Sequence, residues 1–175
     1  LRYTTTQVNG SNDWDINDWK LTIPASKDTW YGSGGDSAAE LEPERCESSK
    51  DLLVNDSDVY DSDIGLSYFN TDEGSMHFRA DMGYGTSTQN SNYIRSELRE
   101  LYQSSTQPDC STSDEDTSWY LDDTRTNKTN HQLTATLRVE DYPNINNQDP
   151  KVVLGQIHGW KINQALVKLL WEGES

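Results

Sequence analysis

The sequence predicts an all-β domain made of two packed antiparallel sheets of the jelly-roll type. Several segments rich in β-branched and aromatic residues alternate apolar and polar positions, which is typical of half-buried strands. Clusters of Gly, Asn, Asp and Ser separate these segments, as turns do. The 175 residues are enough for one domain with a hydrophobic core and too few for two ordinary ones.

Seven segments are expected to form strands, and turn signals separate them. These segments are Trp19–Ile23, Ile64–Asn70, Ser75–Ala80, Tyr93–Tyr102, Gln132–Glu140, Lys151–Trp160 and Ala165–Trp171. Only Asp36–Leu53 has helical character, and because Pro43 interrupts it we expect at most one or two short turns there. Seven strands are few for a jelly-roll core, and the last one runs almost to the final residues EGES. We therefore expect residues 1–175 to form a single domain that is the N-terminal part of a longer jelly roll, completed by a further C-terminal segment.

The net charge is −16 and the isoelectric point is about 4.3. Such acidity argues against nucleic acid and against an anionic membrane surface as partners. No apolar run approaches the roughly 20 residues that span a bilayer. Residues 36–73 and 109–123 together carry the whole excess of acidic residues. The neutral remainder can therefore still form a locally positive site for an anionic ligand.

Each acidic segment contains one of the two cysteines, Cys46 and Cys110. The first residues, LRYTTTQVNG, lack the pattern of a signal peptide, so we expect any leader to have been removed from an exported protein. In an exported protein the two cysteines would form one disulfide, whereas the alternative is two separate buried thiols. We expect no cofactor and no metal. A divalent cation between the two acidic loops is the alternative, and it is disfavoured because DSDVYDSDIG lacks the full spacing of a calcium loop.

The first candidate motif is R-S-E-L-R at 95–99. On a strand, Arg95, Glu97 and Arg99 share one face. One carboxylate between two guanidiniums can hold both in place and leave their outer N–H donors for the carboxylate of a ligand. The alternative is a solvated sheet face with cross-strand ion pairs.

The second candidate motif is V-V-L-G-Q-I-H-G-W at 152–160. Its alternation places Gln156, His158 and Trp160 on one face, where an amide, an imidazole and an aromatic ring suit a sugar-binding groove. Histidine is the side chain best suited to proton transfer near neutral pH, although a lone strand histidine is often structural. Lys168 alternates with leucines in the following strand and is either a second inward cation or a surface lysine.

Together with W-K-L-T-I-P at 19–24, these motifs resemble alginate lyases of polysaccharide-lyase family seven and the related family eighteen. The boxes R-[ST]-E-[LV]-R and Q-[IV]-H of these families match without a substitution, in the expected order, and the resemblance covers about residues 14–171. It implies a secreted β-jelly-roll enzyme that cleaves alginate by β-elimination in a groove on a concave sheet. Endolytic action on both mannuronate and guluronate blocks is expected.

Carried over residue by residue, the resemblance implies that Arg95 and Gln156 contact the uronate carboxylate. His158 would neutralise that carboxylate or act as the base on the C5 proton. Glu97 and Arg99 would shape and charge the groove, and Trp160 and Lys168 are the further candidates for substrate binding. The catalytic set is therefore His158, Gln156 and Arg95.

The chain departs from the family in one motif. The box Y-x-K-x-G-x-Y-x-Q, which supplies a catalytic tyrosine, does not occur in these 175 residues. We expect the C-terminal segment that completes the domain to carry this tyrosine. The alternatives to an alginate lyase are a non-catalytic carbohydrate-binding β-sandwich and a lyase acting on another polyuronate. A glycoside hydrolase is disfavoured, because Glu97 and Glu100 would face opposite sides of a strand.

Overall fold

A computed structural model describes residues 2–6, 16–43, 46, 58–72, 75–81, 83–101, 133–142, 150–159 and 162–173. The described strands form three sheets, and all strand pairs are antiparallel. The structure therefore confirms the expected β-rich, antiparallel class of fold.

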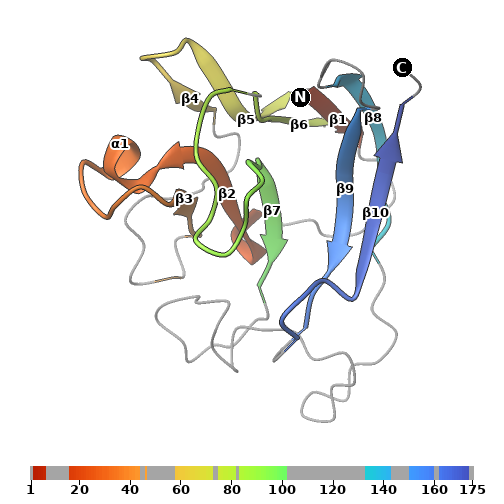
Figure 1. Ribbon diagram of the computed structural model, residues 1–175. Helices are drawn as coiled ribbons and strands as arrows, with labels where there is room; N and C mark the ends of the chain where they lie inside the picture. The colour runs from red at the N-terminus through yellow and green to blue at the C-terminus, as the bar shows by residue number, and fades with distance from the viewer. Residues whose placement is uncertain are drawn as a thin grey trace.

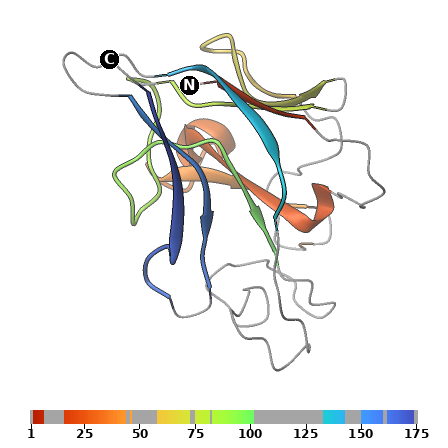
Figure 2. The same cartoon turned by 90° about the vertical axis from the view of Figure 1, so that its right-hand side faces the viewer.

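Five strands form the largest sheet, in the spatial order β4-β5-β6-β1-β8. They are β1 (Arg2–Thr6), β4 (Val59–Asp61), β5 (Leu66–Asp72), β6 (Ser75–Arg79) and β8 (Thr136–Asp141). A second sheet, in the order β3-β2-β7, contains β2 (Trp19–Ser26), β3 (Ala38–Leu41) and β7 (Glu97–Glu100). Strands β9 (Lys151–Ile157) and β10 (Val167–Glu172) pair as a two-stranded ribbon. In Figures 1 and 2 the five-stranded sheet lies above the other two, and the ribbon runs beside β7.

Two short helical segments flank β2. The 3₁₀ helix η1 (Ile16–Asp18) precedes it, and the single-turn helix α1 (Lys27–Tyr31) follows it directly. The hydroxyl of Ser26 caps α1 by accepting a hydrogen bond from the backbone N–H of Thr29 at 3.0 Å. Gly32 ends α1 in the left-handed conformation, with φ of 76°, and this turns the chain toward β3.

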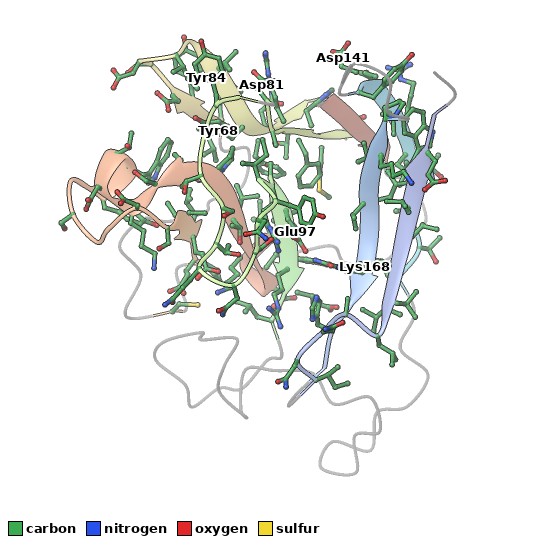
Figure 3. All side chains as sticks on the ribbon, in the orientation of Figure 1. Tyr68, Asp81, Tyr84, Glu97, Asp141 and Lys168 are labelled. Atoms are coloured by element: carbon green, nitrogen blue, oxygen red, sulfur yellow. The ribbon has the colours of Figure 1, made fainter. Side chains whose placement is uncertain are left out.

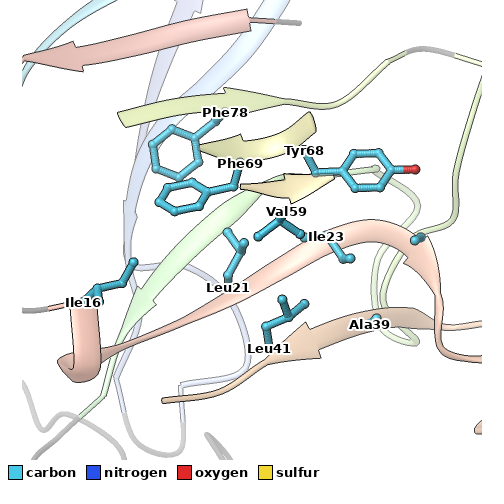
Figure 4. Packing of buried hydrophobic residues seen from close by; sticks show 10 residues of the cluster. Ile16, Leu21, Ile23, Ala39, Leu41, Val59, Tyr68, Phe69 and Phe78 are labelled. Atoms are coloured by element: carbon cyan, nitrogen blue, oxygen red, sulfur yellow. The ribbon is translucent and has the colours of Figure 1, made fainter. Parts of the chain in front are cut away.

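The hydrophobic core lies between the five-stranded sheet and the three-stranded sheet (Figure 4). Strand β2 contributes Leu21 and Ile23, and the facing sheet contributes Phe69 and Phe78, whose rings meet edge to face with centroids 5.1 Å apart. The alternation in β2 that buries Leu21 and Ile23 sends Lys20 and Thr22 to the other face. The three-stranded sheet thus has one apolar face and one polar face.

The ribbon exposes apolar side chains on its outer face. Val153 and Ile157 of β9 and Val167, Leu169 and Leu170 of β10 are each 43–59% exposed. In contrast, Val152 is buried, and Leu154 and Gln156 are half-buried. The alternation expected for this segment therefore places Gln156 on the side that faces the rest of the molecule.

The strands observed at 19–26, 66–72, 75–79, 136–141, 151–157 and 167–172 confirm six of the expected strands with small shifts at their ends. The seventh, Tyr93–Tyr102, is described only up to residue 101, and of that part only Glu97–Glu100 pairs with β2. The helical expectation for Asp36–Leu53 is wrong where the structure describes that segment. Ala38–Leu41 forms β3, because Ala39 and Leu41 are buried in the core when this segment pairs with β2. The short strands β1 and β4 were not predicted.

Among the described residues, no helix is both long enough and apolar enough to cross a membrane.

We expect Phe69→Ala to lower the free energy of unfolding by about 3–5 kcal/mol, because Phe69 is fully buried between the two sheets. Tyr84→Ala is the control, since Tyr84 is 62% exposed, and it should cost less than about 1 kcal/mol. Denaturant unfolding measures both values. Equal effects of the two substitutions would contradict the placement of the core.

Candidate active site

The segment R-S-E-L-R at 95–99 leads into β7 and forms most of it. Its residues alternate between the protein interior and the polar face of the three-stranded sheet. Ser96 is buried, and its hydroxyl donates to the backbone carbonyl of Tyr68 at 2.7 Å, which ties the segment to β5. Leu98 packs against the hydrophobic core. Glu97 and Arg99 lie opposite Thr22 and Lys20 of β2 and so share the polar face of the three-stranded sheet.

The carboxylate of Glu97 joins β7 to the ribbon. Its Oε2 accepts a hydrogen bond from Nη1 of Arg95 at 3.2 Å, and its Oε1 accepts one from Nε2 of Gln156 at 2.5 Å. Figure 3 shows Glu97 on β7 and Lys168 on the neighbouring ribbon. A guanidinium and an amide from distant parts of the sequence are therefore held on one carboxylate.

Arg99 lies on the same polar face, near a salt bridge between Lys20 and Glu40. Nζ of Lys20, which is only 3% exposed, forms a salt bridge of 3.0 Å with Glu40. Burial lowers the pKa of Arg99 from its ordinary value, while the nearby carboxylates of Glu97 and Glu40 oppose that shift. Arg99 stays cationic, since a guanidinium remains protonated in proteins. It contributes a positive charge beside Glu97.

His158 follows directly after β9 and lies within electrostatic reach of this cluster. Its pKa lies below the ordinary 6.5, first because burial disfavours the imidazolium and then because the charge of Arg99 repels it. Lys168 and Arg95 act in the same direction, and Glu97 opposes them. The imidazole is therefore neutral at neutral pH and can accept a proton.

Lys168 sits opposite Gln156 in the pairing of β10 with β9. Its side chain is exposed, yet its charge reaches His158, which places it on the site side of the ribbon. The structure thus brings together Arg95, Glu97 and Gln156 by hydrogen bonds and adds Arg99, His158 and Lys168 through charge. The roles of these residues in binding or catalysis stay predictions.

Two of the expected residues lie outside the described part of the chain, namely Trp160 and Cys110. Cys46 is 2% exposed and packs with Leu101 at the end of β7. The pairing of Cys46 with Cys110 stays a prediction.

The side chain of Tyr68 is buried, with 5% of its surface exposed. Its hydroxyl donates to Oδ2 of Asp61 at 3.0 Å in a buried pair. Burial and the neighbouring carboxylate of Asp61 both raise the pKa of Tyr68. Its phenol therefore stays protonated.

The sequence analysis did not predict two features near Glu97, a salt bridge on the polar face and a loop serine bound to Arg95. Lys20 and Glu40 add a salt bridge to the polar face, and the period-two pattern of β2 contained a signal for Lys20. Ser91 accepts a hydrogen bond from Arg95 across a loop, and no spacing rule would have found it.

A separate pocket lies between α1 and the turn after β4. In Figure 1 these two elements lie on the side of the molecule away from the ribbon. Trp30 and Tyr60 form its aromatic walls, and Asp61 and Asp63 supply two carboxylates, so it does not suit an anion. Within the described ranges, no group of three or more His, Cys, Asp or Glu side chains is arranged to hold a metal ion.

Residues 14–175 match a family model described as alginate lyase. No curated protein and no solved structure matches the chain.

We expect His158 to titrate below pH 6.5 in the folded protein, because burial and three cations disfavour its charged form. Lys168→Met should raise this pKa, since it removes one of those cations. The control is Lys151→Met, because Lys151 lies at the other end of the same ribbon and pairs with Glu172 at 2.8 Å. The imidazole proton signals in an NMR titration measure all three values. A wild-type value at or above 6.5 would contradict the described environment.

Proposed function

Because the chain belongs to the alginate lyase family, we propose that it cleaves alginate by β-elimination, using the residues gathered at Glu97. The observation that carries this proposal is the pair of hydrogen bonds from Arg95 and Gln156 to the two oxygens of Glu97. Through these bonds a guanidinium and an amide are oriented beside a neutral imidazole, which is what removal of a proton next to a carboxylate requires.

The difficulty of the reaction lies at C5 of the uronate. The proton there is only weakly acidic, because its removal places a second negative charge on the carboxylate. Arg95 and Gln156 each keep further N–H donors beyond those given to Glu97, since a guanidinium has five and an amide has two. Donors aimed at the substrate carboxylate stabilise the developing charge, and one such donor is typically worth about 3 kcal/mol.

We propose that His158 either acts as the base that removes the C5 proton or neutralises the carboxylate of the uronate. As base, Nδ1 or Nε2 would accept the C5 proton, and the C–H electron pair would form the C4–C5 double bond as O4 leaves. The lowered pKa of His158 keeps it unprotonated and ready for this step near neutral pH. The cations Arg99 and Lys168 would attract neighbouring uronate carboxylates of the polyanionic chain.

The leaving O4 must receive a proton. We propose that the tyrosine of the box Y-x-K-x-G-x-Y-x-Q donates it from a C-terminal segment that also completes the catalytic domain. This segment would continue the three sheets into a jelly roll with a concave groove.

Several finer features belong to the same proposal. The motifs R-S-E-L-R and Q-I-H favour polysaccharide-lyase family seven or the related family eighteen. We propose endolytic cleavage of both mannuronate and guluronate blocks by a secreted protein in which Cys46 and Cys110 form a disulfide and Trp160 contacts the sugar.

Elimination produces a C4–C5 double bond conjugated to the carboxylate, which absorbs ultraviolet light. We expect alginate treated with the protein to gain this absorbance. Arg95→Ala and His158→Ala should each lower kcat by at least about 100-fold, because each removes a group that acts in the transition state. Circular dichroism checks that both variants keep the wild-type fold.

Binding of alginate without any gain in absorbance would instead identify a carbohydrate-binding module. Absorbance gained only with a different polyuronate would assign another substrate. A near-wild-type rate for either variant would remove that residue from the mechanism.

The salt dependence of KM tests the electrostatic part of the proposal. KM for alginate should rise several-fold between about 0.05 M and about 0.5 M NaCl, because salt screens the attraction between the polyanion and the cations of the site. Arg99→Gln should raise KM at low salt and flatten the dependence. A KM that is indifferent to ionic strength would contradict the assignment of Arg99.

A further inference from the structure

We propose that Ser91 is a positioning residue that holds the terminal nitrogen of the Arg95 guanidinium that Glu97 does not bind. This inference rests on the function proposed above, in which Arg95 binds the substrate carboxylate. Oγ of Ser91 accepts a hydrogen bond from Nη2 of Arg95 at 2.7 Å, while Nη1 is bound by Glu97 at 3.2 Å. The two branches of the guanidinium are therefore held by two different residues.

The hydroxyl of Ser91 is well suited to this task. Its oxygen also accepts the backbone N–H of Tyr93 at 3.1 Å, so both of its lone pairs are used. The backbone N–H of Ser91 in turn donates to the carbonyl of Thr88 at 3.0 Å. The turn and the guanidinium thus share one oxygen atom.

The loop that carries Ser91 is fastened to the three-stranded sheet. The N–H of Thr86 donates to the carbonyl of Pro24 at 2.7 Å, and the N–H of Ala38 donates to the carbonyl of Ser87 at 3.1 Å. Gly85, with φ of 98°, lies so close to Pro24 that a Cβ there would be 2.3 Å from the carbonyl oxygen. Ser91 is therefore held by the same sheet that supplies Glu97.

The contact with Glu97 alone does not fix the orientation of the Arg95 guanidinium. A carboxylate that holds only Nη1 allows the guanidinium plane to turn about that bond, and Gln156 already occupies its second oxygen. Nε of Arg95 is buried and has no hydrogen-bond partner among the described residues, so it does not restrain the plane. The contact with Ser91 supplies the second fixed point.

The experiment compares Ser91→Ala with Ser91→Thr, which keeps the hydroxyl. Asn92→Ala is the control, because Asn92 is the exposed neighbour in the same loop. In the ultraviolet assay on alginate, we expect Ser91→Ala to lower kcat by about tenfold with a smaller change in KM, because a misplaced guanidinium still attracts the polyanion but stabilises the transition state less well. Ser91→Thr should recover most of this loss, and Asn92→Ala should match the wild type.

A second readout does not depend on activity. The Nε–H of Arg95 is buried and should exchange slowly with water in a proton–nitrogen NMR spectrum, where Arg95→Lys identifies its signal. Ser91→Ala should speed this exchange, and Ser91→Thr should restore it.

The two readouts separate the two proposals. A wild-type protein without lyase activity would contradict the proposed function, and the exchange rates would still test the role of Ser91. Unchanged kcat and unchanged exchange in Ser91→Ala would overturn the role of Ser91, as would a threonine variant that is as impaired as the alanine variant while both keep the wild-type melting temperature.

Discussion

The candidate site depends on one carboxylate, that of Glu97, which is shared between two sheets. Its oxygens accept one hydrogen bond each from Arg95 and Gln156, and these residues are 61 positions apart in the printed sequence. A half-buried carboxylate needs such donors, because leaving it without partners would cost several times what each bond contributes. The same requirement that stabilises Glu97 therefore determines where the side chains of Arg95 and Gln156 lie.

The alternation of apolar and polar residues was enough to predict most of the fold and the side on which the candidate residues lie. Strand β2 shows why. A period of two assigns each residue of a half-buried strand to a face, so Leu21 and Ile23 lie on the core face, and Lys20 and Thr22 lie on the other face. It failed for Ala38–Leu41, because alanine and glutamate favour helix locally and only the pairing with β2 makes this segment a strand.

The candidate site was predictable as two separate motifs but not as a cluster. Spacing showed that Arg95 and Glu97 share a face, and separately that Gln156 and His158 do. The contact between Glu97 and Gln156 depends on how the ribbon packs against β7, and periodicity contains no information on that packing. The contact of Ser91 with Arg95 is set by a loop, where side chains follow no fixed alternation.

The ribbon of β9 and β10 carries the amide of Gln156 and, just past β9, the imidazole of His158, and its strands pair only with each other among the described strands. These two groups therefore belong to one two-stranded unit, separate from the sheet that carries Glu97 and Arg99. Detachment of the ribbon would separate Gln156 and His158 from Glu97 and the arginines in one step. It would leave the core between the other two sheets intact. The candidate site can therefore be lost in one step while most of the architecture survives.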